Sequence, residues 1–148
     1  MKQPIFLIGY MAAGKTSLGR FASKRLGREF IDLDKYIEAR YRQSVSDLFA
    51  TRGEEAFRII ERNMLHEVGE FDNVLIATGG GTPCFFDNMA YMNERGVAVF
   101  LTCFFRGTAL TTVFRWFPNC IWVELNIQQA VFCAVAWQCL YSFSLTIH

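Results

Sequence analysis

The chain is poor in the residues that mark metal centres, disulfide scaffolds and nucleic-acid-binding surfaces. Its 148 residues include two histidines and five cysteines, and no two cysteines form a C-x-x-C pair. An odd number of cysteines without a regular spacing indicates free thiols, so we expect a cytoplasmic protein. The net charge of +1 gives no electrostatic reason to expect a nucleic acid as a partner. A chain of this length is typical of one domain, and we expect a monomer.

Charged residues are nearly absent from the last third of the chain. Residues 1–103 hold 26 of the 29 charged residues, whereas residues 104–148 hold three charges and all three tryptophans. The uncharged run 125–147 is long enough to span a bilayer, but amides interrupt it and no lysine or arginine flanks it closely. We therefore do not expect a membrane span. The alternatives are a packed C-terminal strand and helix, or an altered C-terminus such as a frame-shift produces.

The composition divides the chain into two parts. We expect residues 1–103 to form the core of the domain, and residues 104–148 to be an atypical, aromatic and charge-poor segment of the same domain. The start of the core has weak features of a secretory signal, because Lys2 precedes a short apolar run and small residues. A buried strand that enters a phosphate-binding loop accounts for the same residues and for the glycines that follow, so we expect the strand.

A phosphate-binding loop is indicated by residues 7–20, LIGYMAAGKTSLGR, which contain Gly9-x-x-x-x-Gly14-Lys15-Thr16. An apolar run, residues 4–9, precedes the loop, and a helix is expected over residues 15–26. In such a loop the backbone N–H groups point inward, the lysine contacts the β and γ phosphates, and the threonine hydroxyl binds Mg²⁺. We expect an ATP or GTP site. The expected nucleotide-binding residues are Gly9, Ala12, Ala13, Gly14, Lys15, Thr16 and Ser17.

Apolar runs alternate with amphipathic stretches through the core. Strands are expected at 4–9, 29–34, 73–81 and 97–103, and helices at 15–26, 35–42, 54–68 and 84–96. Ser44-x-x-Asp47 resembles a capping box, and Gly53 interrupts the helical pattern that resumes at residue 54. This alternation predicts an α/β domain with a parallel sheet, in which ligands bind beyond the carboxyl ends of the strands.

Two carboxylates lie at the end of the second expected strand. Asp32 and Asp34 are two residues apart, so in a strand they point to the same side, and a cation is needed between such close charges. We assign Asp32 to the Mg²⁺ shell through water, and Asp34 to the acceptor hydroxyl as orienting group or general base. The alternative for Asp34 is a capping role for the helix that follows.

An arginine and a glycine triplet complete the candidate site. Arg58 lies between Glu54 and Glu61 at helical spacing, and could belong to a solvated row of ion pairs or bind a substrate carboxylate with Glu61 holding it. Gly79, Gly80 and Gly81 follow the third expected strand, where bare backbone lets a ligand approach closely. We favour substrate binding by Arg58 and the three glycines.

These residues together resemble the shikimate kinase family. The resemblance is carried by GYMAAGKTSLG, FIDLD, FRIIE and TGGGTP, in this order, and it covers roughly residues 4–103. It implies a P-loop kinase-like, three-layer α/β/α fold with a central parallel sheet. It also implies transfer of the ATP γ-phosphate to the 3-hydroxyl of shikimate, with Mg²⁺, on the route to chorismate and the aromatic amino acids. The family roles fall on Lys15, Thr16 and Ser17 for nucleotide and metal, Asp32 for the metal shell, and Asp34, Arg58 and Gly80 for shikimate.

The sequence departs from the family in two places. Ala12 stands where the family more often has glycine, and we expect the extra methyl group to be tolerated. After Cys103 the family continues with a lid that carries an arginine, a second shikimate-binding arginine and adenine contacts, and none of these is recognisable here. Arg106 and Arg115 lie outside the family's context. Because an arginine at the transferring phosphate is worth roughly 10³–10⁵ in rate, activity is expected to be impaired.

Three other functions are alternatives to shikimate kinase. Another small P-loop kinase of a hydroxy acid, such as a gluconate kinase, would also use Arg58 and the glycine triplet. A nucleotide-binding remnant without catalysis would follow from the change in composition at Cys103. A GTPase is disfavoured because the sequence contains no N-K-x-D motif.

Overall fold

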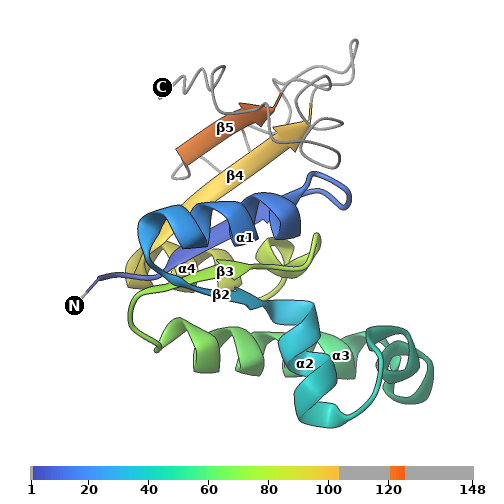
Figure 1. The fold of residues 1–148 in the computed structure, drawn as a ribbon. Coiled ribbons are helices and arrows are strands. Elements are labelled where there is room, and N and C mark those ends of the chain that lie inside the picture. Colours follow the sequence, from blue (N-terminus) through green and yellow to red (C-terminus); the bar gives the residue numbers. More distant parts are fainter. Residues whose placement is uncertain (1, 104–120, 126–148) are drawn as a thin grey trace.

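The structure, a computed structural model that describes residues 2–103 and 121–125, is built on a five-stranded parallel sheet (Figure 1). The strand order is β2-β3-β1-β4-β5. The strands are β1 (Ile5–Gly9), β2 (Glu29–Asp32), β3 (Val74–Ala77), β4 (Val97–Cys103) and β5 (Ile121–Leu125). Because β1 lies in the middle of the sheet, the loop that follows it leaves from the centre of the carboxyl edge.

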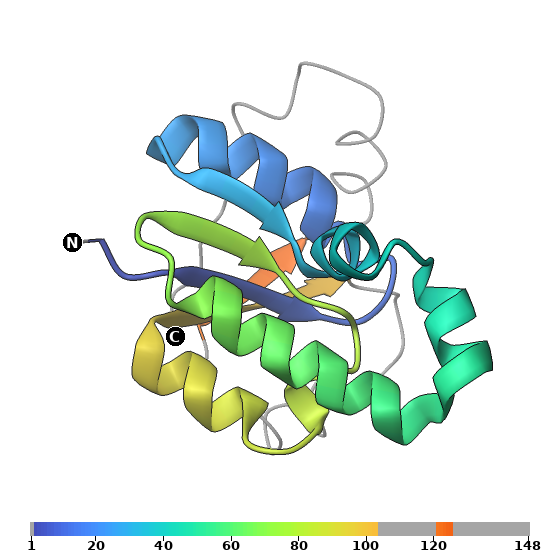
Figure 2. The same cartoon turned by 90° about the horizontal axis from the view of Figure 1, so that it is seen from below.

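The helices cover both faces of this sheet. They are α1 (Lys15–Leu26), α2 (Leu33–Tyr41), α3 (Val45–Gly69), the short 3₁₀ helix η1 (Thr82–Cys84) and α4 (Asn88–Arg95). Figure 2 shows α1 on one side of the sheet and α3 with α4 on the other. The expected three-layer α/β/α arrangement is therefore confirmed.

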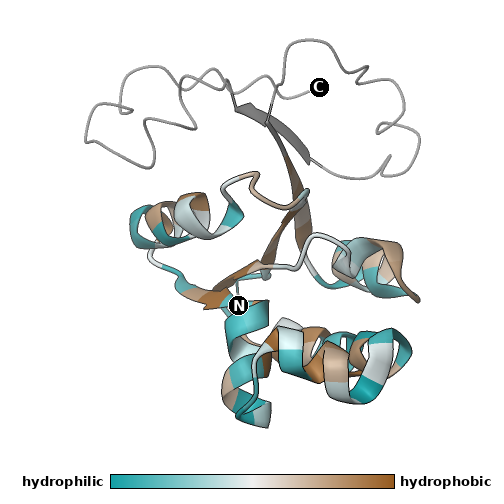
Figure 3. Cartoon of the chain, turned by 90° about the vertical axis from the view of Figure 1, so that its right-hand side faces the viewer, coloured by the Kyte–Doolittle hydropathy of each residue, from teal (hydrophilic) through white to brown (hydrophobic). Residues whose placement is uncertain are grey.

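Alternating residues of the strands supply the two halves of the core. Phe6 and Ile8 of β1 pack with buried residues of α3 and α4, whereas Leu7 packs with the α1 side. The period of two residues sends neighbouring side chains to opposite faces, so a strand that is buried on both faces must be apolar throughout. This explains the continuous apolar runs, and in Figure 3 the strands are mostly brown while the surrounding helices mix brown with teal.

The long helix α3 begins at the expected cap and is interrupted once. The Ser44 side chain accepts a hydrogen bond from the backbone N–H of Asp47 at 3.0 Å, which confirms the capping interaction. Gly53 has φ 80° and ψ 168°, a non-helical conformation that separates a first segment from the longer segment carrying Arg58. The conformation lies in a region that only glycine adopts readily, so the predicted interruption at this residue is confirmed.

Three predicted boundaries were wrong. The second strand ends at Asp32 instead of 34, because the Asp32 side chain accepts from the backbone N–H of Lys35 and thereby begins α2 at Leu33. The helix expected from residue 84 begins only at Asn88, after the turn η1 (Thr82–Cys84). The third strand ends at Ala77, so the glycine triplet lies in a loop.

The last part of the chain adds β5, for which no boundary was predicted. Its backbone pairs in parallel with β4, with Val99 opposite Ile121 and Cys103 opposite Leu125. Apart from Leu125, the uncharged run 125–147 lies outside the described residues, as do Arg106 and Arg115. Among the described residues, no helix is both long and apolar enough to cross a membrane.

Candidate active site

A cavity of about 450 Å³ opens at the carboxyl ends of β1, β2 and β3. It brings together expected residues from three separate stretches of the sequence, namely Ala12, Ala13, Gly14, Lys15, Thr16, Ser17, Asp32, Asp34, Gly79 and Gly80. Met11, Ala77 and Thr78 complete its lining. Three expected site residues, Gly9, Arg58 and Gly81, are not part of the lining. The carbonyl of Gly9 accepts a hydrogen bond from Lys15, Gly81 follows Gly80 in the chain, and Arg58 lies beside Gly81.

Lys15 lies at the start of α1 with its ammonium group turned back into the loop. Its Nζ donates to the backbone carbonyls of Gly9 and Tyr10, both at 2.7 Å, and the residue is only 9% exposed. Burial lowers the pKa of Lys15, while the charges of Asp34 and Asp32 act in the opposite direction. A phosphate group in the loop would offer this lysine charged oxygens in place of neutral carbonyls, which gives a stronger interaction.

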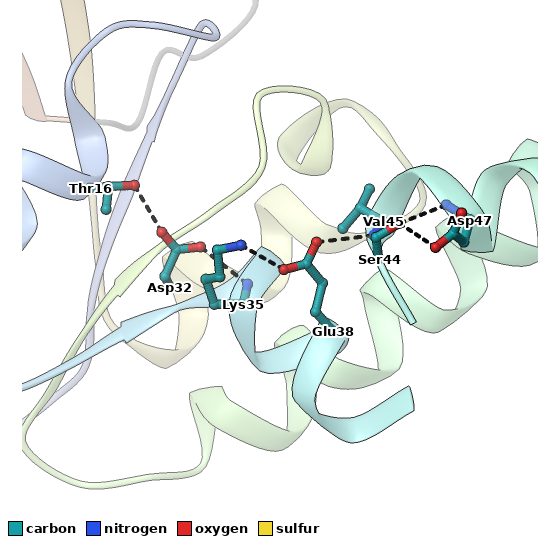
Figure 4. Close-up of polar contacts among 7 residues, drawn as sticks. All are labelled: Thr16, Asp32, Lys35, Glu38, Ser44, Val45 and Asp47. Carbon is teal, nitrogen blue, oxygen red and sulfur yellow. Dashed lines mark hydrogen bonds and ion pairs between the residues drawn. The ribbon is translucent and has the colours of Figure 1, made fainter. Parts of the chain in front are cut away.

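Thr16 and Asp32 form the part of the site that fits a divalent cation. The Thr16 hydroxyl donates to Oδ2 of Asp32 at 2.8 Å, and both side chains line the cavity (Figure 4). These are oxygen ligands of the type that Mg²⁺ prefers. Within the described residues, no group of three or more His, Cys, Asp or Glu side chains could hold a metal ion. The arrangement therefore fits a metal held mainly by phosphate oxygens and water, with one or two protein ligands.

The two aspartates of this stretch have different structural roles. Asp32 is the N-cap of α2, because its Oδ1 accepts from the backbone N–H of Lys35 at 3.3 Å. Asp34 lies within the first turn of α2, so the proposed capping role belongs to Asp32. Asp32 is the last residue of β2, so the expectation of a strand end was wrong for Asp34 alone. Both carboxylates still line the cavity, because α2 begins directly beside it.

Asp34 is surrounded by conditions that favour its protonated form. Burial is the main cause that raises the pKa of Asp34, and the nearby carboxylates of Asp32, Glu61 and Glu38 raise it further. The Lys15 ammonium group opposes them by lowering it. A carboxylate with a raised pKa is a stronger base than an ordinary aspartate, which suits a group that must remove a proton from an alcohol.

Arg58 is held beside the cavity by a buried acid and an aromatic ring. Its Nη1 donates to Oε2 of Glu61 at 2.8 Å, and its Cζ lies 4.0 Å from the centre of the Phe85 ring. The Glu61 side chain is only 2% exposed, whereas the second acid, Glu54, pairs at 3.5 Å and is 64% exposed. A solvated row of ion pairs would leave both acids exposed, so the pair with Glu61 does not fit that alternative.

The glycine triplet passes between these groups with little room for side chains. A Cβ atom on Gly79 would lie 2.9 Å from Oε1 of Glu61 and 3.2 Å from Oδ1 of Asp34. On Gly81 it would lie 3.1 Å from Nη2 of Arg58. The loop therefore places bare backbone against both candidate substrate-binding groups, Asp34 and Arg58.

Several residues of the site were not identified from the sequence. Thr82 donates to Glu61 at 2.5 Å, Phe85 stacks on Arg58, and Met11 lines the cavity at 85% exposure. Thr82 directly follows the glycine triplet and Phe85 comes three residues later, and this nearness in sequence was the one available signal for them. Their contacts with α3 join residues that are distant in sequence.

The backbone of Ala12 is strained, which was not expected from the sequence. It adopts φ 63°, in the left-handed region that residues with a Cβ atom rarely occupy. The unfavourable contact is between the Cβ atom and the residue's own backbone, at a cost of roughly 1–2 kcal/mol. The methyl group is tolerated at this expense, since the loop still closes around the cavity.

Comparisons with known proteins agree on one family. A sequence model described as shikimate kinase matches residues 11–110. A shikimate kinase of Parabacteroides distasonis is 65% identical over 97 residues, which cover 66% of this chain and 56% of that protein. A shikimate kinase of Bacteroides fragilis is 62% identical over the same length and is covered to 54%. The chain therefore spans little more than half the length of these curated relatives.

Two solved structures of shikimate kinases also resemble this chain, and they cover a larger part of it than the curated relatives do. A crystal structure of a shikimate kinase from Bacteroides thetaiotaomicron has a TM-score of 0.74 and 38% identity, covering 88% of this chain and 93% of that chain. A shikimate kinase from Acinetobacter baumannii, solved in complex with shikimate, has a TM-score of 0.67 and 33% identity. It covers 78% of this chain and 62% of that chain.

Proposed function

Because the chain belongs to the shikimate kinase family, we propose that it transfers the γ-phosphate of ATP to the 3-hydroxyl of shikimate. The observation that carries this proposal is that three groups of candidate residues lie close together. The phosphate loop, the carboxylate of Asp34 and the first two glycines of the triplet share one cavity, and Arg58 lies beside the third, Gly81. A phosphate donor and a small acid can therefore be held side by side.

The proposed nucleotide site uses the loop after β1. The backbone of residues 9–17 and the N-terminus of α1 would hold the phosphates, with Lys15 as the positive charge nearest to them. Lys15 would exchange its bonds to the carbonyls of Gly9 and Tyr10 for bonds to phosphate oxygens. Mg²⁺, held by Thr16 and by Asp32 through water, would neutralise charge on the phosphates.

The proposed acceptor site uses one cation and one base. The guanidinium group of Arg58 would bind the carboxylate of shikimate, since arginine presents a planar pair of donors that matches a carboxylate. The backbone of Gly79, Gly80 and Gly81 would allow the ring to approach. The carboxylate of Asp34 would orient the 3-hydroxyl and take its proton as the phosphate is transferred.

Residues 104–148 limit the rate that we propose for this reaction. The lid and the second substrate-binding arginine expected in the family have no counterpart in the sequence of residues 104–148, so we propose that transfer is slow. The division into a core, residues 1–103, and an atypical C-terminal segment belongs to the same proposal, as do the monomeric state and the cytoplasmic location.

Release of ADP by the purified full chain in Mg-ATP tests this function. We expect shikimate to stimulate release, gluconate to have no effect, and Lys15→Ala to abolish the stimulated rate. Stimulation by gluconate alone would replace shikimate kinase with another hydroxy-acid kinase. No stimulation by either acid, from folded protein that binds Mg-ATP, would instead indicate a nucleotide-binding remnant without catalysis.

A further inference from the structure

The carboxylate of Glu61 is held from two sides in the buried layer behind the glycine triplet. The hydroxyl of Thr82 donates to Oε1 at 2.5 Å, and Nη1 of Arg58 donates to Oε2 at 2.8 Å. Glu61 is 1% exposed and Thr82 is fully buried. Each oxygen of this charged group therefore has a protein donor in place of the water that burial has removed.

The Thr82 hydroxyl is itself fixed by the backbone around it. The side-chain amide of Asn88 donates to the backbone carbonyl of Thr82 at 2.9 Å, and Asn88 is also fully buried. The first residue of α4 therefore anchors the turn that carries Thr82. Because the threonine is β-branched, few χ1 rotamers are open to it, and in the one it adopts the hydroxyl donates to Glu61.

The same turn also supplies the ring that stacks on Arg58. Phe85 follows directly after η1, and its ring centre lies 4.0 Å from Cζ of Arg58. Residues 82–85 thus restrain the guanidinium group of Arg58 in two ways. Thr82 holds the Glu61 carboxylate that bonds to its edge, and the Phe85 ring stacks on its face. Nη2 keeps a weak contact of 3.5 Å to the exposed Glu54, so this nitrogen remains available for a ligand.

We propose that Thr82 is a positioning residue, which orients Arg58 toward the carboxylate of the acceptor by fixing the Glu61 side chain. The part of this inference that concerns the acceptor rests on the proposed function. Without the hydroxyl, Oε1 of Glu61 loses its donor in a site closed to water. The carboxylate then turns to find another donor, and the guanidinium group loses its fixed direction.

Four variants separate this role from a general effect on folding. Thr82→Val keeps the shape of the side chain and removes the hydroxyl, whereas Thr82→Ser keeps the hydroxyl. Thr51→Val is the matched control, because Thr51 is exposed on α3 and its hydroxyl donates to the carbonyl of Asp47 on the same helix. Thr82→Ala removes the same hydroxyl without a methyl group against the carboxylate, and so provides a second test that does not depend on how valine packs.

The first measurement needs no substrate. Solvent exchange of the Arg58 Nε–H proton is followed by NMR, with Arg58→Lys used to assign the signal. The Arg58 Nε atom is buried, so slow exchange is expected in the unaltered chain. We expect exchange to become about tenfold faster in Thr82→Val and Thr82→Ala, because a buried charged group has lost a donor, and to change little in Thr82→Ser and Thr51→Val.

The second measurement is the dissociation constant for shikimate, with Mg-ADP as the reference ligand. We expect about tenfold weaker binding of shikimate by the two variants without the hydroxyl, unchanged binding of Mg-ADP, and recovery in Thr82→Ser. Unchanged Arg58 exchange in both variants would overturn the positioning role. Faster exchange, with no binding of shikimate even by the unaltered chain, would support that role and contradict the proposed function instead.

Discussion

At the scale of single residues, the environment of Asp34 links the chemistry of the site to the stability of the chain. Burial and three neighbouring carboxylates raise the pKa of Asp34 above its ordinary value of 3.8. In the interval between the ordinary and the raised value, the folded chain binds a proton that the unfolded chain has released. Stability therefore falls as the pH rises through this interval, and the cost is complete above it.

We expect Asp34→Asn to have opposite effects on activity and stability. Loss of the proposed base should reduce phosphate transfer by roughly 10²–10⁴-fold. Removal of an unfavourable buried charge should raise the free energy of unfolding at pH 7, and this gain should shrink toward pH 3, where the unaltered Asp34 is protonated. Urea unfolding at both pH values, with Asp47→Asn at the exposed start of α3 as control, provides the measurement. An equal gain at both pH values would contradict the raised pKa.

A second residue-scale prediction concerns the strain in the phosphate loop. Ala12→Gly removes the Cβ atom that disfavours φ 63°, but it also adds freedom to the unfolded chain. We expect a net gain of roughly 0.5–1 kcal/mol in the free energy of unfolding. The control is Ala50→Gly within α3, which should lose about 1 kcal/mol. A loss of similar size in both variants would show that Ala12 is not strained.

Individual site residues could be predicted where they are contiguous in sequence. The phosphate loop was identified because its chemistry needs glycines, a lysine and a threonine at fixed spacing, and Asp32 and Asp34 because they follow a strand. Thr82 could not be assigned a role, since its hydrogen bond reaches Glu61 on another element, 21 residues away. Whether such a pair meets depends on how α3 packs beside the turn, and no local pattern records that packing.

At the scale of elements, the interruption of α3 determines where Arg58 lies relative to the first segment of that helix. Phe49 before the break and Phe57 after it pack with ring centres 4.2 Å apart. Arg58 lies within 5.6 Å of both rings. The break therefore lets two segments of one helix fold against each other around the arginine.

We expect Gly53→Ala to destabilise the chain by roughly 1–3 kcal/mol, because φ 80° with ψ 168° is strained for any residue with a Cβ atom. Among the described residues, no atom lies within 4 Å of a Cβ atom placed at Gly53, so the loss would come from the backbone. Thermal unfolding measures the change, and Thr51→Ala, at an exposed position two residues away, should differ little from the unaltered chain. Equal stability of all three chains would show that the break does not depend on glycine.

The element boundaries show how far local patterns extend. Helix α1 and strand β4 were predicted with their observed bounds, because a glycine or a change of period marks each end. The end of β2 was misplaced by two residues. Two aspartates in the stretch FIDLD can each serve as a cap, and the choice of Asp32 depends on Lys35 N–H, whose position follows from the path of α2.

At the scale of the whole molecule, the strand order puts all the candidate groups at one edge. With β1 between β3 and β4, the loop after β1 faces the glycine triplet after β3 and the aspartates after β2. The parallel sheet predicted from the sequence is confirmed, and binding of ligands at this edge stays a prediction. The sequence could not give the strand order or the pairing of β5, since these arise from contacts between distant segments.

The central claim is that this site phosphorylates shikimate on its 3-hydroxyl, and the product itself tests it most directly. The full chain is incubated with Mg-ATP and shikimate, and the products are followed by ³¹P NMR with coupling to the ring protons. We predict a new phosphate ester at carbon 3, formed by the unaltered chain and absent with Lys15→Ala. Folded protein that forms no such ester, or forms it equally well without Lys15, would contradict the account.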